Sequence, residues 1–332
     1  MNTDRIGAKK VLVVSTGGTI ASRYDPVEKA LMSVATGAEL LSTLGSLAPA
    51  VDIVLEEFSN LGSNRIDLET SFRLACHIDE LLKDDTICGC VVTHGTDTLE
   101  ESAFLANLVI SSSKPVVFTG AQRGADQPDA DGPRNLADAI AVAASADAAD
   151  LGTLVVFAGK VLSAIDATKV HTSRLAAYDS SGLGPLGEVD HGAVLITSRP
   201  SGYPAIKAQH IETRVDLITL AMGADERLYE AAVASGSRGI VLETFGRGNA
   251  TPEVVAAVTR ATQKGLVTIV TSRCPQGRVL PLYGDGGGRD LEEAGAIFAG
   301  RLKGPKARIL LCLALANMPE QEIAALFAQF GR

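Results

Sequence analysis

The sequence predicts an α/β fold of two domains: a larger N-terminal, mainly parallel sheet flanked by helices and a smaller C-terminal α/β domain. Three observations support this prediction. Short apolar runs alternate with helix-length patterns along most of the chain, which is typical of parallel sheets. The 332 residues exceed the length at which one hydrophobic core usually stops growing. A stretch rich in Gly, Pro and Ser follows Tyr178 and separates two such series.

The N-terminal domain is expected over residues 1–204. Its predicted strands are mostly continuous apolar runs, the pattern of strands buried on both faces. They lie at Val11–Ser15, Val51–Leu55, Gly89–Thr93, Val116–Thr119 and Leu154–Phe157. Helical patterns lie between them, at Gly37–Thr43, Glu69–Lys83, Leu99–Ile110 and Asn135–Ala146. The strand-like piece Ala193–Thr197 then predicts a hairpin that precedes a linker.

The linker is expected at residues 205–214 and the C-terminal domain at 215–332. In the second series, helices are predicted at Glu226–Ala234, Pro252–Lys264 and Pro319–Phe330. Strand-like runs lie at Val215–Leu220, Gly239–Leu242, Val267–Thr271 and Ala307–Leu315. The last two elements along the sequence also fit one long helix broken before Pro319. The glycine-rich piece Gly284–Gly288 is expected to be a mobile loop.

Composition and charge exclude several classes of protein. The formal net charge is −9 and the longest basic cluster is Lys9-Lys10, which argues against a nucleic-acid surface. No apolar stretch of about 18 residues predicts a membrane span, and no secretion signal is recognisable at the N-terminus. Five cysteines at irregular spacing do not form a disulfide framework and are expected to be core thiols. The expected location is the cytoplasm.

The first motif whose residues could bind a ligand or take part in catalysis is Ser15–Ile20, directly after the first predicted strand. Its glycines, Gly17 and Gly18, permit a tight turn and a close approach of backbone to a ligand. Open α/β sheets bind ligands beyond the carboxyl ends of their strands. We therefore expect the hydroxyls of Thr16 and Thr19 to face a crevice. No Gly-Lys-Ser/Thr follows, which argues against a phosphate loop, although an ordinary strand–helix turn also fits the motif.

The second motif is Thr93–Thr98, which follows another buried strand. A threonine hydroxyl is a poor nucleophile and needs a base or a cation to activate it. Asp97 could bind a substrate ammonium or orient a lysine. His94 stands too close to Asp97 for the usual Ser-His-Asp arrangement and is expected to be structural. Thr98 followed by Glu101 also fits a helix capping box.

The third motif is Asp166–Lys169, a lysine among small residues beyond the strand Leu154–Phe157. If it is partly buried, its ammonium must pair with a carboxylate or lose its proton. Lys160 is a local rival, and an exposed loop lysine is the other interpretation. Spacing alone does not choose between them.

Together these motifs resemble those of the bacterial-type asparaginase and glutaminase–asparaginase family. The resemblance covers nearly the whole sequence, because further blocks match in the same order. They are Lys114–Val117, Thr119–Arg123, Asp131–Leu136, Gly184–Gly187, Gly246–Asn249 and Thr271–Cys274. What the resemblance implies is hydrolysis of a side-chain amide without metal or cofactor.

The resemblance also implies roles for individual residues. Thr19 would be the nucleophile, or the threonine next to the attacked carbonyl, and Thr96, Asp97 and Lys169 would form the second catalytic group. The substrate would be a small zwitterionic amino-acid amide, held through a carboxylate for its ammonium and neutral donors for its carboxylate. The residues implied in substrate binding are Gly18, Gly62, Ser63, Asn64, Thr96, Asp97 and the backbone of Ala121.

The sequence departs from the family pattern near the pocket. The family usually has a tyrosine in the loop after the first motif, where this protein has Ala30–Ser33, so Tyr24 is the candidate lid residue. Asn64 stands where many members have glutamine. The family is typically a tetramer of two dimers in which a neighbour's C-terminal domain completes each pocket. Asn249 and Tyr283 are the candidates for that contribution.

Three functions therefore follow as hypotheses. The first is hydrolysis of L-asparagine, with glutamine as a lesser substrate. The second is an enzyme of the same fold that acts on another amide, such as the glutamine-hydrolysing component of an amidotransferase; the start of the sequence at the first strand argues against it. The third is a non-catalytic amino-acid-binding protein. Thr19, Thr96, Asp97 and Lys169 together argue for retained chemistry.

Overall fold

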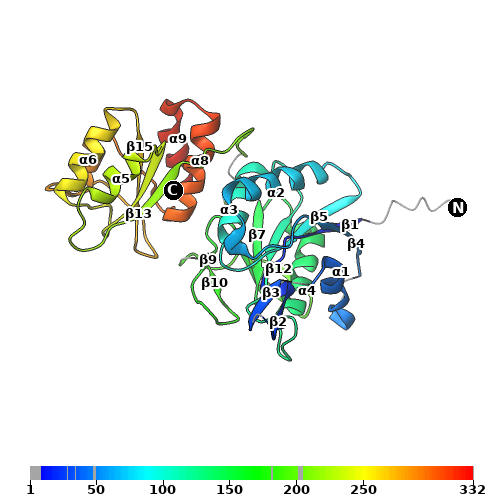
Figure 1. The fold of residues 1–332 in the computed structure, drawn as a ribbon. Coiled ribbons are helices and arrows are strands. Elements are labelled where there is room, and N and C mark those ends of the chain that lie inside the picture. The colour runs from blue at the N-terminus through cyan, green and yellow to red at the C-terminus, as the bar shows by residue number, and fades with distance from the viewer. Residues whose placement is uncertain are drawn as a thin grey trace. The chain divides into compact units, whose positions relative to one another are not determined.

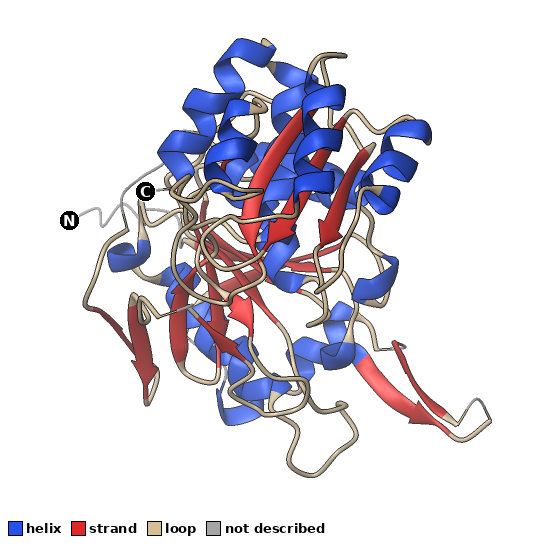
Figure 2. Cartoon of the chain, turned by 90° about the vertical axis from the view of Figure 1, so that its left-hand side faces the viewer, coloured by secondary structure: helices blue, strands red, loops and turns tan. Residues whose placement is uncertain are grey.

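The computed structural model describes residues 9–27, 29–33, 35–47, 50–180, 182–200 and 205–331. The polypeptide divides into two compact units, Met1–Ala205 and Ile206–Arg332. Each unit has its own strands and helices (Figures 1 and 2). The predicted α/β class is confirmed, with the larger sheet in the first unit.

The first unit is built on an eight-stranded sheet in the order β12-β11-β8-β7-β6-β5-β1-β4. The parallel strands are β1 (Lys10–Ser15), β4 (Asp52–Glu57), β5 (Ile87–Thr93), β6 (Val116–Thr119) and β7 (Thr153–Phe157). The antiparallel part consists of β8 (Lys160–Ser163), β11 (Gly187–Asp190) and β12 (Ala193–Ile196). Strand β1 therefore lies between β4 and β5, so the ends of these three strands are neighbours.

Both faces of the inner strand β1 are buried. Val11 and Val13 of β1 lie in one core cluster with Leu40 and Leu136 of the helices. The alternate residues Leu12 and Val14 are equally buried and point to the opposite face, because side chains alternate along a strand. The helices of this unit are α1 (Gly37–Ser42), α2 (Leu68–Leu81), α3 (Leu99–Val109) and α4 (Gly132–Ala144).

Two small hairpins complete the first unit. Strands β2 (Ser22–Asp25) and β3 (Ala30–Ser33) pair antiparallel, with Tyr24 opposite Leu31. Strands β9 (Thr168–Lys169) and β10 (Tyr178–Asp179) pair with Lys169 opposite Tyr178. Short 3₁₀ turns occur at Thr19–Ala21, Gly45–Leu47, Ser63–Arg65 and Ala146–Ala148. The first and third of these turns carry residues of the candidate site.

The second unit is a four-stranded parallel sheet in the order β13-β14-β15-β16. Its strands are β13 (Val215–Thr219), β14 (Gly239–Thr244), β15 (Val267–Ser272) and β16 (Ile297–Phe298). Its helices are α5 (Arg227–Ala234), α6 (Pro252–Thr262), α7 (Gly288–Glu293), α8 (Gly304–Asn317) and α9 (Glu320–Phe330). None of the helices within the described ranges is long and apolar enough to cross a membrane.

Two expectations about the second unit need comment. Gly284–Gly288 is not a loop throughout, because Gly287 caps α7 and Gly288 is its first residue. A close backbone contact explains why residue 287 is a glycine: a Cβ there would lie 2.2 Å from the carbonyl oxygen of Tyr283. The strand expected at Ala307–Leu315 is wrong, because these residues lie in helix α8. The alternative is the one that the structure shows: the helical stretch is broken before Pro319, which is the N-cap of α9.

Candidate active site

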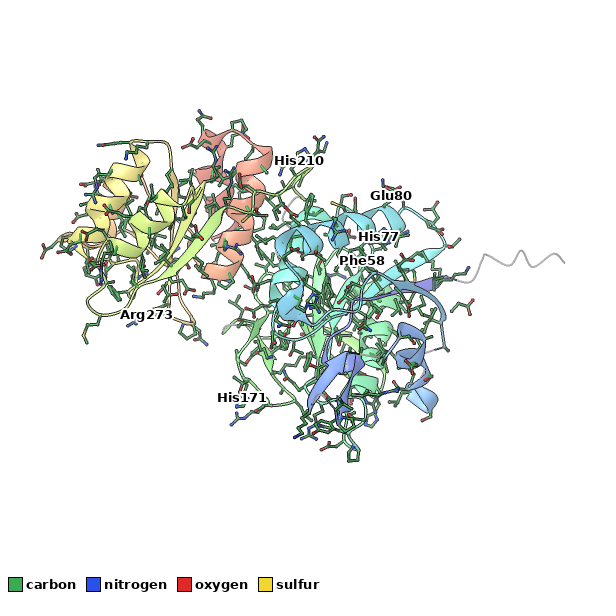
Figure 3. The ribbon with its side chains drawn as sticks, viewed as in Figure 1. Phe58, His77, Glu80, His171, His210 and Arg273 are labelled. Atoms are coloured by element: carbon green, nitrogen blue, oxygen red, sulfur yellow. The ribbon has the colours of Figure 1, made fainter. Side chains whose placement is uncertain are left out.

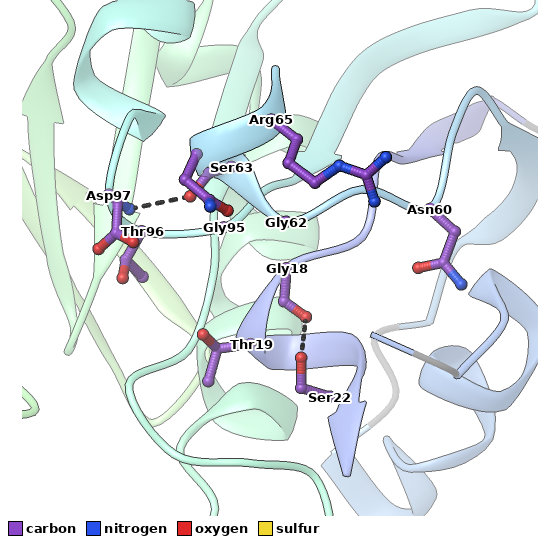
Figure 4. A pocket seen from close by; sticks show the side chains of 11 residues that line it. Gly18, Thr19, Ser22, Asn60, Gly62, Ser63, Arg65, Gly95, Thr96 and Asp97 are labelled. Carbon is purple, nitrogen blue, oxygen red and sulfur yellow. Dashed lines mark hydrogen bonds between the residues drawn. The ribbon is translucent and has the colours of Figure 1, made fainter. Parts of the chain in front are cut away.

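A cavity of about 350 Å³ lies beyond the carboxyl ends of β1, β4 and β5 in the first unit (Figure 4). Its lining residues come from the three segments that follow these strands. They are Gly18, Thr19, Ser22, Asn60, Gly62, Ser63, Asn64, Arg65, Gly95, Thr96 and Asp97. The crevice beyond the strand ends that the sequence predicted is therefore present.

Glycines explain why the three segments come so close together. Gly17 and Gly18 have φ values of 106° and 88°, a region that favours glycine. A Cβ on Gly18 would lie 2.3 Å from the backbone nitrogen of Gly95, and one on Gly17 would lie 2.6 Å from the backbone nitrogen of Leu61. These backbone-to-backbone contacts place Thr19 and Thr96 on the same cavity.

Thr16 does not face the cavity as expected. Its side chain is fully buried, and its hydroxyl donates to the carbonyl oxygen of Thr93 at 2.8 Å. The backbone nitrogen of Thr16 donates to the same oxygen at 3.1 Å. The Thr16 hydroxyl thus links the ends of the neighbouring strands β1 and β5. Thr19 is the threonine of this motif that lines the cavity.

Ser63 joins the second and third segments. Its hydroxyl accepts a hydrogen bond from the backbone nitrogen of Asp97 at 3.2 Å (Figure 4). Its carbonyl oxygen accepts one from the hydroxyl of Thr98 at 2.9 Å. The predicted capping box of Thr98 and Glu101 is therefore wrong, because the Thr98 side chain makes no cap hydrogen bond and is used for Ser63.

Lys169 lies beside Thr96 and Asp97. Its Nζ is 2.8 Å from Thr96 Oγ1 and 2.9 Å from Asp97 Oδ1. The Lys169 side chain is 17% exposed, whereas that of Asp97 is 69% exposed. Lys160 instead pairs with Asp179 at 3.5 Å. The structure thus distinguishes the two lysines that spacing left open, and the ammonium sits between a hydroxyl and a carboxylate.

Two residues that the sequence analysis did not single out hold this lysine. Tyr178 pairs with Lys169 across β9 and β10, and its hydroxyl donates to the carbonyl oxygen of Thr96. The Glu100 carboxylate accepts a hydrogen bond from the backbone nitrogen of Lys169. Burial raises the pKa of Tyr178, and the nearby Glu100 and Asp97 carboxylates add to this shift. The phenol therefore stays a proton donor to Thr96.

His94 is structural, as the sequence predicted. It is fully buried, and its Nδ1 lies 2.8 Å from the carbonyl oxygen of Gly95. Burial lowers its pKa to about 4, so the ring is neutral near pH 7. His77 and His171, which are labelled in Figure 3, belong to the same unit and are not among the residues that line the cavity. No histidine lines the described cavity, which leaves hydroxyls, carboxylate and lysine for proton transfer.

Other candidate residues are placed differently. Gly62 and Asn64 line the cavity, whereas Ala121 and Tyr24 do not. Ala121 is fully buried in the core cluster that contains Ile20. Tyr24 is 55% exposed, and its backbone nitrogen donates to Asp126 Oδ2 at 3.1 Å. The contact of Ala121 with an amide and the lid role of Tyr24 stay predictions.

Asn249 and Tyr283 lie in the second unit. The Asn249 side chain accepts a hydrogen bond from the backbone nitrogen of Gly288 at 3.2 Å. Tyr283 is 55% exposed, and its carbonyl oxygen accepts from the backbone nitrogen of Arg289 at 2.8 Å. Their contribution to a neighbouring protomer remains a prediction.

Comparison with known proteins shows the family to which the chain belongs. The model of the asparaginase N-terminal domain matches residues 10–201, and that of the glutaminase/asparaginase C-terminal domain matches residues 214–327. The chain belongs to the asparaginase family. The family resemblance seen in the two threonine motifs is thereby confirmed.

Three relatives of this asparaginase-family protein are informative. An L-asparaginase of Bacillus licheniformis is 34% identical over 94% of this chain and 97% of the relative. A subunit of the glutamyl-tRNA(Gln) amidotransferase of Archaeoglobus fulgidus is 32% identical over 96% of this chain and 77% of the relative. A crystal structure described as a probable cytoplasmic L-asparaginase from Campylobacter jejuni has a TM-score of 0.84 at 30% identity, covering 96% of this chain and 99% of the other.

The geometry suits the chemistry of an asparaginase-family amidohydrolase. One hydroxyl, Thr19, faces the cavity from the first motif, and a second, Thr96, is hydrogen-bonded to an ammonium. Gly18, Gly62 and Gly95 bring main chain to the cavity surface, where amides can stabilise a developing oxyanion. Within the described ranges, no group of three or more His, Cys, Asp or Glu side chains is placed to hold a metal ion.

Proposed function

We propose that the protein hydrolyses L-asparagine to L-aspartate and ammonia, with weaker activity on L-glutamine. The observation that carries the proposal is the contact of Lys169 Nζ with Thr96 Oγ1 at 2.8 Å, beside a cavity that Thr19 also lines. A threonine hydroxyl needs such an activating partner, because it is a weak nucleophile at its own pKa.

The substrate would bind as a zwitterion. Asp97 is the carboxylate on the cavity, so it would receive the α-ammonium. Ser63 and Asn64 would bind the α-carboxylate, together with backbone amides at Gly18 and Gly62. This arrangement uses opposite groups for the two charges and leaves the side-chain amide free to point at the threonines.

Reaction would then proceed in two halves. Thr19 Oγ attacks the amide carbon, and its proton passes to the departing nitrogen through Thr96, whose hydroxyl oxygen is oriented by Lys169. The C–N bond breaks, ammonia leaves and an acyl-threonine ester remains. Water then attacks this ester, giving aspartate and restoring the Thr19 hydroxyl. Backbone amides would stabilise the oxyanion in both halves.

We also propose a cytoplasmic homotetramer built from two dimers. The similarity to the probable cytoplasmic L-asparaginase of Campylobacter jejuni supports the location. Cell fractionation and light scattering of the purified protein test the two statements separately.

The test of the activity is ammonia release from L-asparagine, L-glutamine and D-asparagine. We expect the highest kcat/KM with L-asparagine. Thr19→Val, which removes the hydroxyl and keeps the shape, should reduce kcat by several orders of magnitude with the fold intact. A preference for glutamine would favour the second candidate function, the glutamine-hydrolysing component of an amidotransferase. The 32% identity to the amidotransferase subunit of Archaeoglobus fulgidus supports this candidate. Binding of asparagine without ammonia release would indicate an amino-acid-binding protein.

A further inference from the structure

Arg65 gives the cavity a positive charge that the proposed reaction does not use. It is the one cationic side chain among the lining residues of the described cavity. Asp97, the one carboxylate there, already pairs with Lys169 at 2.9 Å. Arg65 forms no ion pair or side-chain hydrogen bond with any residue in the described ranges. An arginine in this position can bind a carboxylate through two parallel hydrogen bonds.

The position of Arg65 indicates where such a carboxylate would lie. Ser63, Asn64 and Arg65 form one 3₁₀ turn. Ser63 is 4% exposed and turns toward Asp97, whereas the exposed Arg65 side chain extends the other way, toward Asn60 (Figure 4). The turn therefore leads from the place proposed for the substrate α-carboxylate to an exposed side chain of the cavity lining. A group attached through that carboxylate would leave the cavity beside Arg65.

We infer that the site also takes peptides that begin with asparagine, and that Arg65 binds the C-terminal carboxylate of an asparaginyl dipeptide. The inference rests on the proposed function, because it uses the same threonines and the same ammonium site. One added residue moves the terminal carboxylate by about 3.5 Å, a displacement that a long and flexible arginine side chain can follow. The dipeptide keeps a free α-ammonium for Asp97 and a side-chain amide for Thr19.

The reaction on a dipeptide is the same amide hydrolysis. Asparaginyl-alanine and water give aspartyl-alanine and ammonia, so the C–N bond of the side-chain amide breaks and the peptide bond stays. The peptide bond replaces the free α-carboxylate at Ser63, and the negative charge moves toward the guanidinium of Arg65. Free asparagine lacks this distant carboxylate, so Arg65 should matter more for the dipeptide.

The experiment compares kcat/KM for L-asparagine, L-asparaginyl-L-alanine and the N-methylamide of that dipeptide. Ammonia release and mass spectrometry of the product report the side-chain hydrolysis. The wild-type protein should hydrolyse the dipeptide better than its N-methylamide. Arg65→Met should lower kcat/KM for the dipeptide about two- to fivefold relative to asparagine, an effect in the range of a solvent-exposed ion pair. Arg65→Lys should recover part of the loss.

Arg73→Met is the matched control. Arg73 is also exposed, lies on the following helix α2 and is absent from the cavity lining. Its removal changes the net charge equally and should leave the ratio of the two substrates at the wild-type value.

Three results would overturn the inference. The first is that the protein hydrolyses asparagine but not the dipeptide. The second is that Arg65→Met leaves the ratio of kcat/KM for the dipeptide to that for asparagine unchanged. The third is that Arg65→Met lowers kcat/KM for asparagine or for the N-methylamide as much as for the dipeptide. Hydrolysis of the dipeptide but not of asparagine would support this inference and refute the proposed function. Hydrolysis of neither would refute both.

Discussion

Tyr178→Phe is the substitution that best tests how the lysine is positioned. The change removes one hydroxyl, which donates to the carbonyl oxygen of Thr96, and leaves the ring in place. The ring is 2% exposed and packs 5.0 Å from the ring of Phe157, measured between centroids. Phenylalanine therefore fills the same space, and the lost hydrogen bond dominates the effect.

The expected loss of stability follows from that hydrogen bond. A buried carbonyl oxygen left without its partner costs about 1–3 kcal/mol. Each kcal/mol shifts the Tm of a 150–250-residue domain by about 2–4 °C. The Tm of the first unit should therefore fall by roughly 2–12 °C.

The expected loss of activity follows from the strand pairing. Tyr178 lies opposite Lys169 in the β9–β10 pair and also holds Thr96, so its hydroxyl links the two partners of the proposed catalytic contact. A displacement of about 1 Å at reacting groups can cost on the order of 100-fold in rate. We expect kcat to fall about tenfold or more, because the displaced groups are those proposed to act on the reacting amide.

The assay combines ammonia release at 25 °C with thermal unfolding followed by circular dichroism. Tyr229→Phe is the control, because the hydroxyl of Tyr229 is also buried and lies 2.7 Å from Thr268 Oγ1 in the second unit. It should lose stability and keep kcat. If Tyr178→Phe lowers Tm but keeps the wild-type kcat, the hydroxyl supports the fold and does not position the lysine.

Three further outcomes are expected. Gly18→Ala should cost several kcal/mol more in urea unfolding than Gly223→Ala; both have φ above 80°, but only the first Cβ would meet backbone, at 2.3 Å. Lys169→Met should abolish turnover and leave substrate binding measurable by calorimetry, whereas Lys160→Met should turn over normally. Burial lowers the pKa of His94 from 6.5 to about 4, so the unfolded state binds its proton first as the pH falls. The unfolding free energy should then drop by up to about 3 kcal/mol between pH 6.5 and 4, and equal slopes for His94→Gln and wild type would contradict this.

The sequence predicted the elements that form the large core. The expected strand Val11–Ser15 is β1 at Lys10–Ser15, and the expected helix Leu99–Ile110 is α3 at Leu99–Val109. Such elements carry their own signal, because continuous apolar runs and helical periodicity reflect burial of whole faces. The two-residue strands β9 and β10 carry no such signal.

The site was predicted where local sequence defines it and missed where distant contacts do. Thr19 and Thr96 follow from glycine-containing turns at strand ends. Tyr178 was missed because its partner lies 82 residues away and no local pattern marks the contact. Thr98 was misassigned for the same reason, since its hydroxyl binds the backbone of Ser63, 35 residues away, instead of capping its own helix.

The structure constrains the residues proposed for the reaction more tightly than those proposed to select the substrate. Thr19 and Thr96 are held by backbone contacts at Gly18 and Gly95 that tolerate no side chain, so a change there disturbs the fold along with the chemistry. Arg65, by contrast, is an exposed residue on a short turn and has no partner in the described part of the protein. Exposed surface substitutions usually change stability by less than about 0.5 kcal/mol. A change at Arg65 can therefore alter the group proposed to meet the far end of the substrate and leave the proposed threonine site in place.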